Sequence, residues 1–256
     1  MLWRIELKPI GLQLYTVREY AEKDLFGTLE KVADIGFKGV EFAGLYGHKP
    51  SDIAKVLNDL GLKTCAIHDS VPKREDIEKL VQIKHELGCR RVVSMFGPDQ
   101  YESAELCKEA VDRFNEACEM LGQHGILLCT HNHWWEFKTI NGRYALDILM
   151  DECPNLLLEA DLYWAKYAKM DPAEQVARFR SRIPLIHAKD GVIKEPAEFT
   201  AAGAGEVDLA AGIKAADPDV LEWVIVELDE FAGDMWEAVR ESYRYLTRTG
   251  LAEGTR

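Results

Sequence analysis

Eight apolar runs of strand type alternate with amphipathic segments of helix type along this chain, and this alternation constrains the fold more than any other feature. The runs are rich in Val, Ile and Leu and are continuous, so each is expected to be a buried parallel strand. They cover residues 10–15, 38–43, 62–68, 91–96, 126–131, 156–161, 184–188 and 223–228. Glycines that stop a helix shortly before the next strand are expected at Gly36, Gly61, Gly88 and Gly125.

Repeated strand–helix alternation predicts an α/β fold, namely a closed (β/α)₈ TIM barrel. The chain has 256 residues, which is a usual size for such a barrel in one domain, so we expect residues 1–256 to form a single domain. Neither a long linker nor a low-complexity stretch divides it. A doubly wound open sheet is the alternative, but no Gly-x-Gly-x-x-Gly turn follows the first strand.

Composition argues against several classes of partner. The formal net charge of −13 at pH 7 disfavours nucleic acid, because nucleic-acid enzymes carry a basic stripe. The six cysteines form no Cys-x-x-Cys pair and are expected to be mostly buried small residues in a reducing compartment. The N-terminal MLWRIELKPIG lacks the apolar stretch of a signal peptide, and no run approaches the ~20 residues of a membrane span. We expect a cytoplasmic protein without a membrane partner, and a homo-oligomer is compatible with the sequence.

Metal-capable groups end the last four strand runs. Because the carboxyl ends of parallel strands meet at one rim of a barrel, where active sites lie, these groups are expected close together. Their mixture of carboxylate and imidazole suits a hard or borderline divalent metal. Taken alone, Asp161 is equally well explained as a helix N-cap, and His187 as a satisfied rim residue. In chain order the groups are His131, His133, Glu136, Asp161, His187 and Glu227.

Seven segments together point to a known family. In chain order they are GLQLYTVRE, KGVEFAG, HNHWWEF, EADLYW, IHAKD, GAGEVDL and VELDE. They span nearly the whole chain and resemble the sugar phosphate isomerase/epimerase family, which has a xylose-isomerase-like barrel. The wider superfamily also holds inosose dehydratases, ketose 3-epimerases and endonuclease IV. The resemblance implies a divalent metal (Mn, Zn, Co or Mg) and a small sugar or polyol as substrate.

The resemblance also implies four metal ligands, one from each of strands five to eight, commonly Glu, Asp, His and Glu. The last three fall on Asp161, His187 and Glu227. Where many members have the first carboxylate, this chain has His131, and its carboxylate comes later, at Glu136. We expect Glu136 to be the ligand, in a loop that folds back over the rim, with His131 as either a replacement ligand or a catalytic base.

The expected activity is that of a metal-dependent isomerase or epimerase, which removes a proton next to a carbonyl through a metal-stabilised enediolate. Glu136 and Glu227 would act as bases on the two faces of the substrate, and Lys189 would stabilise oxyanion charge. His131 and His133 are further candidate catalytic groups. At the first-half strand ends the resemblance implies pocket residues, which rim packing explains equally well, and Trp164 fits sugar stacking. The substrate-binding candidates are Gln13, Tyr15, Glu41, His68 and Trp164.

Two other functions stay open. A lyase, such as an inosose dehydratase or a 3-keto-glycoside eliminase, would use the extra imidazoles of the His-Asn-His segment as base. A non-catalytic sugar-binding barrel would keep the fold without the metal. The Gly- and Ala-rich loop after His187 is expected to be a lid or substrate loop. Its Gly203-Ala204-Gly205 offers backbone N–H groups for a phosphate, although the lack of an Arg pair favours an unphosphorylated sugar.

Overall fold

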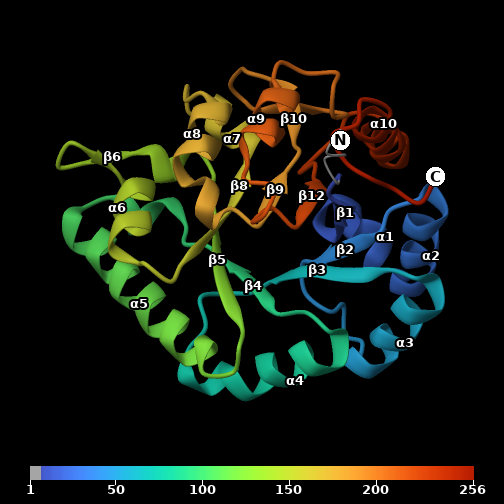
Figure 1. Cartoon of the computed structure of the whole chain (residues 1–256), viewed down its shortest axis with the longest axis horizontal. Coiled ribbons are helices and arrows are strands. Elements are labelled where there is room, and N and C mark those ends of the chain that lie inside the picture. Colours follow the sequence, from blue (N-terminus) through green and yellow to red (C-terminus); the bar gives the residue numbers. More distant parts are fainter. Residues whose placement is uncertain (1–6) are drawn as a thin grey trace, which may run out of the picture.

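Eight parallel strands close into a barrel in the computed structural model, which describes residues 7–256 (Figure 1). Each strand pairs with the next barrel strand along the chain, and the last one returns to pair with the first. The predicted barrel and all eight predicted strand runs are therefore confirmed. The barrel strands are β1 (Ile10–Gln13), β2 (Gly39–Phe42), β3 (Lys63–His68), β4 (Arg91–Ser94), β5 (Leu127–His131), β8 (Leu157–Asp161), β9 (Leu185–His187) and β12 (Trp223–Val226).

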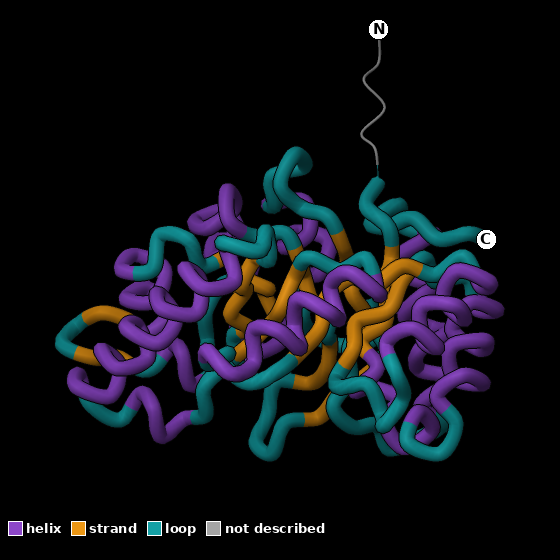
Figure 2. The backbone as a smooth tube through the Cα atoms, turned by 90° about the horizontal axis from the view of Figure 1, so that it is seen from below, coloured by secondary structure: helices purple, strands orange, loops and turns teal. Residues whose placement is uncertain are grey.

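Helices surround the strands on the outside of the barrel, as Figures 1 and 2 show. Gly36, Gly61 and Gly88 follow α2, α3 and α4 directly, with left-handed φ angles, and so end these helices as predicted. Gly125 lies in the turn beyond α5 and does not cap it. The helices are α1 (Arg18–Ala21), α2 (Leu25–Ile35), α3 (Pro50–Leu60), α4 (Ile77–Leu87), α5 (Ala104–Gly122), α6 (Ala145–Glu152), α7 (Leu162–Tyr167), α8 (Pro172–Phe179), α9 (Leu209–Ala215) and α10 (Met235–Arg248).

Side chains on the barrel strands alternate between two environments. Outward residues, such as Leu158 and Val226, pack in the large apolar core beneath the helices. Inward residues, such as Leu185 on β9 and Ile225 on β12, belong to a small apolar cluster that fills the barrel. Because every second residue of a strand faces the same side, the next inward position on β9 is His187. The apolar layer therefore lies directly beneath the polar strand ends.

Two short antiparallel hairpins and several 3₁₀ turns lie in the connections between the barrel strands and the helices. The hairpin of β6 (Thr139–Ile140) and β7 (Arg143–Tyr144) precedes α6, and that of β10 (Asp190–Val192) and β11 (Glu198–Thr200) follows β9. The long Gly- and Ala-rich segment is thus a hairpin and a tight turn that lead into α9. The 3₁₀ turns are η1 (Leu14–Val17), η2 (Arg74–Asp76), η3 (Pro98–Tyr101), η4 (Trp135–Phe137) and η5 (Arg180–Arg182).

The carboxylate of Asp190 organises that tight turn. It accepts the backbone N–H groups of Gly191, Gly203, Gly205 and Val207 at 2.8–3.0 Å. The N–H of Ala204 donates to the carbonyl oxygen of Ala201. The suggestion that Gly203-Ala204-Gly205 holds a phosphate is therefore wrong for this structure, because the chain itself uses those N–H groups.

All six cysteines are buried and free, in agreement with the expectation that most of them are buried small residues. None of the helices within residues 7–256 combines the length and hydropathy that crossing a bilayer requires. We expect no signal peptide in the N-terminal segment. Its first six residues lie outside the described residues.

Gly39→Ala should destabilise the barrel. A Cβ at this position would lie 2.8 Å from the carbonyl oxygen of Lys63 and 2.8 Å from the ring of Trp223. Because the backbone cannot give way cheaply, we expect the free energy of unfolding to fall by about 1–3 kcal/mol, measured by urea denaturation. Gly122→Ala in α5, where the added Cβ meets nothing within 4 Å, is the matched control and should be neutral or slightly stabilising. Equal stability of the two variants would contradict the packing argument.

Candidate active site

A cavity of about 580 Å³ opens at the carboxyl end of the barrel, a size usual for small-molecule sites. Carboxylates and imidazoles dominate its polar lining, and the residues lining it in the described chain include neither Lys nor Arg. A cavity of this composition suits an uncharged, hydroxyl-rich molecule better than a phosphate ester. The lining residues are Gln13, Tyr15, Ala43, Gly44, His68, Asp69, Ser70, Met95, His131, His133, Glu227 and Asp229.

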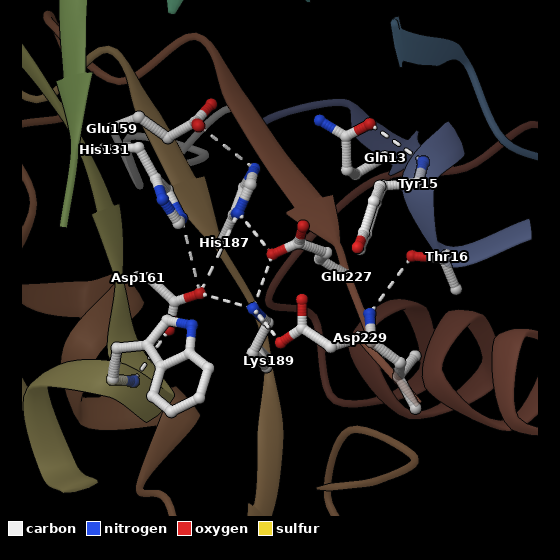
Figure 3. A network of polar contacts seen from close by, with 12 residues as sticks. Gln13, Tyr15, Thr16, His131, Glu159, Asp161, His187, Lys189, Glu227 and Asp229 are labelled. Carbon is white, nitrogen blue, oxygen red and sulfur yellow. Dashed lines mark hydrogen bonds and ion pairs between the residues drawn. The ribbon is translucent and has the colours of Figure 1, made fainter. Parts of the chain in front are cut away.

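Four buried side chains from the ends of β5, β8, β9 and β12 offer ligand atoms that all lie within 4.8 Å of one another. They are His131, Asp161, His187 and Glu227, and we call them the metal-capable group (Figure 3). Nε2 of His131 is 3.5 Å from Oδ2 of Asp161, and Nδ1 of His187 is 2.9 Å from Oε2 of Glu227. The sequence therefore predicted correctly that Asp161, His187 and Glu227 lie together.

Three donor atoms of this group lack a hydrogen-bond partner among the described residues. They are both ring nitrogens of His131 and Oδ2 of Asp161, although the last of these has an ion-pair contact with Nζ of Lys189 at 3.2 Å. Buried polar atoms are rarely left in that state, because each one costs its full desolvation energy. Nitrogen and carboxylate donors are also the usual ligands of Zn²⁺ and related divalent ions. The residues present thus fit a divalent metal.

The two oxygens of Asp161 do different things. Oδ1 accepts the N–H of Trp164 at 2.8 Å and caps α7, while Oδ2 faces the metal-capable group. Asp161 is therefore the helix N-cap that the sequence suggested, and its second oxygen is still positioned to bind a metal. Asn132 fixes the strand end, since its amide bonds both the carbonyl oxygen and the N–H of Asp161 at 3.1 and 3.0 Å. No role for Asn132 is predicted from the sequence, although it stands between two candidate histidines.

Glu136, the expected first ligand, lies outside the metal-capable group. The loop after β5 forms the 3₁₀ turn η4, and Oε2 of Glu136 accepts the N–H of His133 at 2.8 Å. The carboxyl turns back onto its own segment instead of reaching over the rim, and His131 occupies the fourth corner. The structure therefore gives no support to Glu136 as the first ligand, because His131 takes that place among the clustered donors. Burial raises the pKa of the Glu136 carboxyl to about 8.

Lys189 lies fully buried among three carboxylates. Its Nζ is 3.2 Å from Asp161 Oδ2, 2.7 Å from Glu227 Oε2 and 2.8 Å from Asp229 Oδ2. Burial opposes its charge, but the three carboxylates outweigh burial and hold the pKa of Lys189 well above its usual range. The ammonium group therefore stays charged and offsets part of the negative charge at the strand ends (Figure 3).

A second layer of charged groups lies behind His187. Glu41, His68 and Glu159 join His187 in a set whose ligand atoms also lie within 4.8 Å of one another. Burial disfavours the charged imidazole of His68, but Glu41 and Glu159 raise its pKa to about 10. Burial likewise disfavours ionised Glu159, but His187 and His68 hold its pKa well below the usual range.

Glu159 was not identified from the sequence, and Glu41 was expected to contact the substrate. Glu159 lies within an apolar run, but it precedes Asp161 by two residues, so strand periodicity places both on one face. Glu41 is fully buried and does not line the cavity, so its expected contact with substrate is not supported. His68 does line the cavity, as expected.

The remaining candidates lie at the rim or beneath it. Gln13 and Tyr15 line the cavity, and Oε1 of Gln13 accepts the N–H of Tyr15 at 3.0 Å. Trp164 does not line it: its ring is buried, 5.1 Å from Nζ of Lys189, so direct sugar stacking is not supported. His133 stacks on Trp135, and burial, with His131 and Lys189, lowers the pKa of His133 below its usual range.

Comparison with known proteins places this geometry in context. A family model described as "Xylose isomerase-like TIM barrel" matches residues 29–249. A sugar phosphate isomerase/epimerase from Parabacteroides distasonis ATCC 8503 is 25% identical with a TM-score of 0.77, over 98% of this chain and 96% of that one. An inosose dehydratase of Geobacillus kaustophilus (strain HTA426) is 23% identical over 245 residues, 79% of each chain. The IOLI protein, solved with a bound zinc atom, shares the fold: it is 16% identical with a TM-score of 0.71, over 95% of this chain and 98% of that one.

Glu136→Gln should change how stability depends on pH. The carboxyl pKa rises from an ordinary 4.5 to about 8 on folding, so the folded chain holds this proton more tightly than the unfolded chain. That contribution is fully present below about pH 4.5 and is lost as the pH rises through about 8. The metal-free wild type should therefore lose stability relative to the variant between pH 5 and 8, measured by urea denaturation with a chelator present. If the stability difference between the wild type and Glu136→Gln stays constant with pH, Glu136 is not a buried neutral carboxyl. The exposed Glu230→Gln is the control and should show no such pH dependence.

Proposed function

The chain belongs to the xylose isomerase-like TIM barrel family, and on that premise we propose that it catalyses metal-dependent proton transfer next to the carbonyl of a sugar or keto-sugar, as an isomerase or epimerase. The metal-capable group of His131, Asp161, His187 and Glu227 carries the proposal, because its buried donors include three without a hydrogen-bond partner among the described residues. These four side chains would hold Mn, Zn, Co or Mg. When bound, the ion would act as a Lewis acid on the substrate carbonyl and so acidify the neighbouring C–H bond.

The chain itself supplies groups that accept a proton. Glu227 lines the cavity, and although burial opposes its charge, Lys189 and His187 hold its pKa well below the usual range. It is therefore ionised. His133 lines the same cavity and is neutral, because burial and its cationic surroundings lower its pKa. Either group can take a proton from a substrate carbon that lies in the cavity.

His68 is the complementary donor. Its pKa, raised to about 10 by Glu41 and Glu159 against the effect of burial, keeps the imidazole protonated at the edge of the cavity. Pairs of groups whose surroundings push their pKa values apart commonly serve as acid and base. Lys189, held by Asp229, is fully buried and does not line the cavity, so it would stabilise negative charge on a substrate oxygen through its own charge and not by direct contact.

A lyase is the second candidate, and His68 is the observation that favours it. Elimination needs an acid that protonates the departing hydroxyl or glycosidic oxygen, and His68 offers one. The position of Glu136 outside the metal-capable group also argues against an epimerase that uses two metal-bound glutamates. The similarity to an inosose dehydratase supports the same class. The cavity lining favours an unphosphorylated substrate in either case.

Removal of a proposed ligand should remove the metal. Glu227→Gln and His131→Gln should leave the protein with much less than one ion per chain after desalting, and turnover should be lost with it. Glu136→Gln and the exposed Glu230→Gln should keep the wild-type metal content. Elemental analysis by mass spectrometry measures all four variants. A full metal content in Glu227→Gln would overturn the assignment, and loss of metal in Glu136→Gln would restore that residue as a ligand.

Proton transfer can be followed directly by NMR in D₂O. The metal-loaded protein is incubated with ketohexoses, an inosose and a 3-keto-glucoside. An isomerase or epimerase conserves the substrate skeleton and introduces deuterium next to the carbonyl, whereas a lyase releases water or the aglycone. Absence of both deuterium uptake and elimination with every substrate, together with measurable sugar binding, would support a non-catalytic barrel.

A further inference from the structure

His187 lies between two pairs of carboxylates, one pair at each ring nitrogen. Nδ1 faces Glu227 Oε2 at 2.9 Å and Asp161 Oδ2 at 3.9 Å, within the metal-capable group. Nε2 faces Glu41 Oε2 at 2.7 Å and Glu159 Oε2 at 3.3 Å, on the inner side. Figure 3 shows the ring between Glu159 and the Asp161–Glu227 pair. In the function proposed above, the first pair would bind the ion, whereas the second pair acts only on the pKa of His68.

The inner pair has no access to substrate. Glu41 and Glu159 are fully buried, and neither lines the cavity. Their charge is balanced from within the barrel: Nε2 of His68 is 3.0 Å from Glu159 Oε2 and 3.3 Å from Glu41 Oε1. The ring of His68 also lies parallel to that of His187, with centroids 5.9 Å apart. The two carboxylates are thus held in place by a partner that leaves them facing His187.

A carboxylate at one ring nitrogen determines what the other nitrogen can do. When Nε2 of His187 donates its proton to Glu41 at 2.7 Å, Nδ1 can offer a lone pair toward Asp161 and Glu227. Metal-ligating histidines usually donate their second N–H to a carboxylate, carbonyl or water in this way, which fixes the tautomer and increases the basicity of the ligand nitrogen.

We propose that Glu41 and Glu159 are positioning residues for the metal site: Glu41 holds His187 in the tautomer that leaves Nδ1 free, and Glu159, anchored by His68, keeps the ring in place. This inference rests on the proposed function, since it assumes that His187 binds the ion. It gives a role to Glu41 and Glu159, two charged residues that are buried in the barrel and do not line the substrate cavity.

The same four residues, Glu41, His68, Glu159 and His187, raise a rival explanation, namely a second metal ion. Two ions, one at each nitrogen of His187, would require the ring to lose both protons. The 2.7 Å and 3.0 Å contacts of the inner layer are also ordinary hydrogen-bond lengths. The geometry therefore favours positioning, and metal stoichiometry distinguishes the two.

The test combines metal affinity with the tautomer of His187. Zn²⁺ affinity and stoichiometry are measured by competition with a chromophoric chelator for the wild type, Glu41→Gln, Glu159→Gln and the double variant. Each single variant should bind one Zn²⁺ per chain about 10–100-fold more weakly, and the double variant more weakly still. Glu136→Gln, which also replaces a buried carboxylate by an amide near the rim, is the matched control and should keep wild-type affinity.

NMR of the protein labelled with ¹⁵N-histidine reports the tautomer without any substitution. In the Zn²⁺-loaded wild type, His187 should carry its proton on Nε2, and this signature should weaken or shift in Glu41→Gln. A proton on Nδ1 of the loaded wild type would overturn the proposal even if the variants failed to fold.

The outcomes separate this inference from the function on which it rests. One ion per chain with unchanged affinity in the variants would overturn the positioning role and leave the proposed metal site intact. Two ions in the wild type and one in the variants would replace it with a second metal site. A wild type that binds no divalent ion would overturn both, while tight binding without deuterium exchange would remove only the proposed reaction.

Discussion

Compensation of buried charge at the carboxyl end of the barrel is the interaction on which the rest of the site depends. An ion that is buried without a partner costs several kcal/mol, so each charged group here is retained only because a neighbour of opposite charge offsets that cost. Carboxylates from β2, β8 and the segment after β12 meet cations from β3, from β9 and from the short connection between β9 and β10. Within the described chain these are Glu41, Glu159, Asp161, Glu227 and Asp229 on one side and His68, His187 and Lys189 on the other.

This arrangement has a consequence for metal binding. The oxygens of Asp161 and Glu227 that contact Lys189 are on the carboxylates proposed as ligands, so the ammonium group and an ion would compete for them. Asp229 provides a third partner on which Lys189 can remain when the other two are taken. Held by Asp229, Lys189 would keep its positive charge next to the metal-capable group without lining the cavity itself. The same lysine would thus offset negative charge in the metal-free site and, when the metal is bound, contribute positive charge near the substrate.

Much of this site follows from chain order. Parallel strands that each end in a polar group must bring those groups to one rim, which is why Asp161, His187 and Glu227 could be predicted together. Glu159 was not identified because it lies inside an apolar run instead of at its end, and only its spacing from Asp161 reveals that it faces inward. Glu136 was misplaced because its distance along the chain allows several loop paths. A local hydrogen bond to the N–H of His133 selects one that turns away from the rim.

The amino-acid sequence by itself determined the closed barrel, the order of its strands and the rim at which the chemistry lies, because apolar periodicity and chain order are local properties. The tertiary structure decided which donors lie close enough together to share one ion. It also decided that His131 stands where Glu136 was expected, and that His187 is bounded by Glu41 on one side and Glu227 on the other. Those outcomes depend on register between strands far apart in the chain and on hydrogen bonds within loops. Neither can be read from residue spacing along the chain.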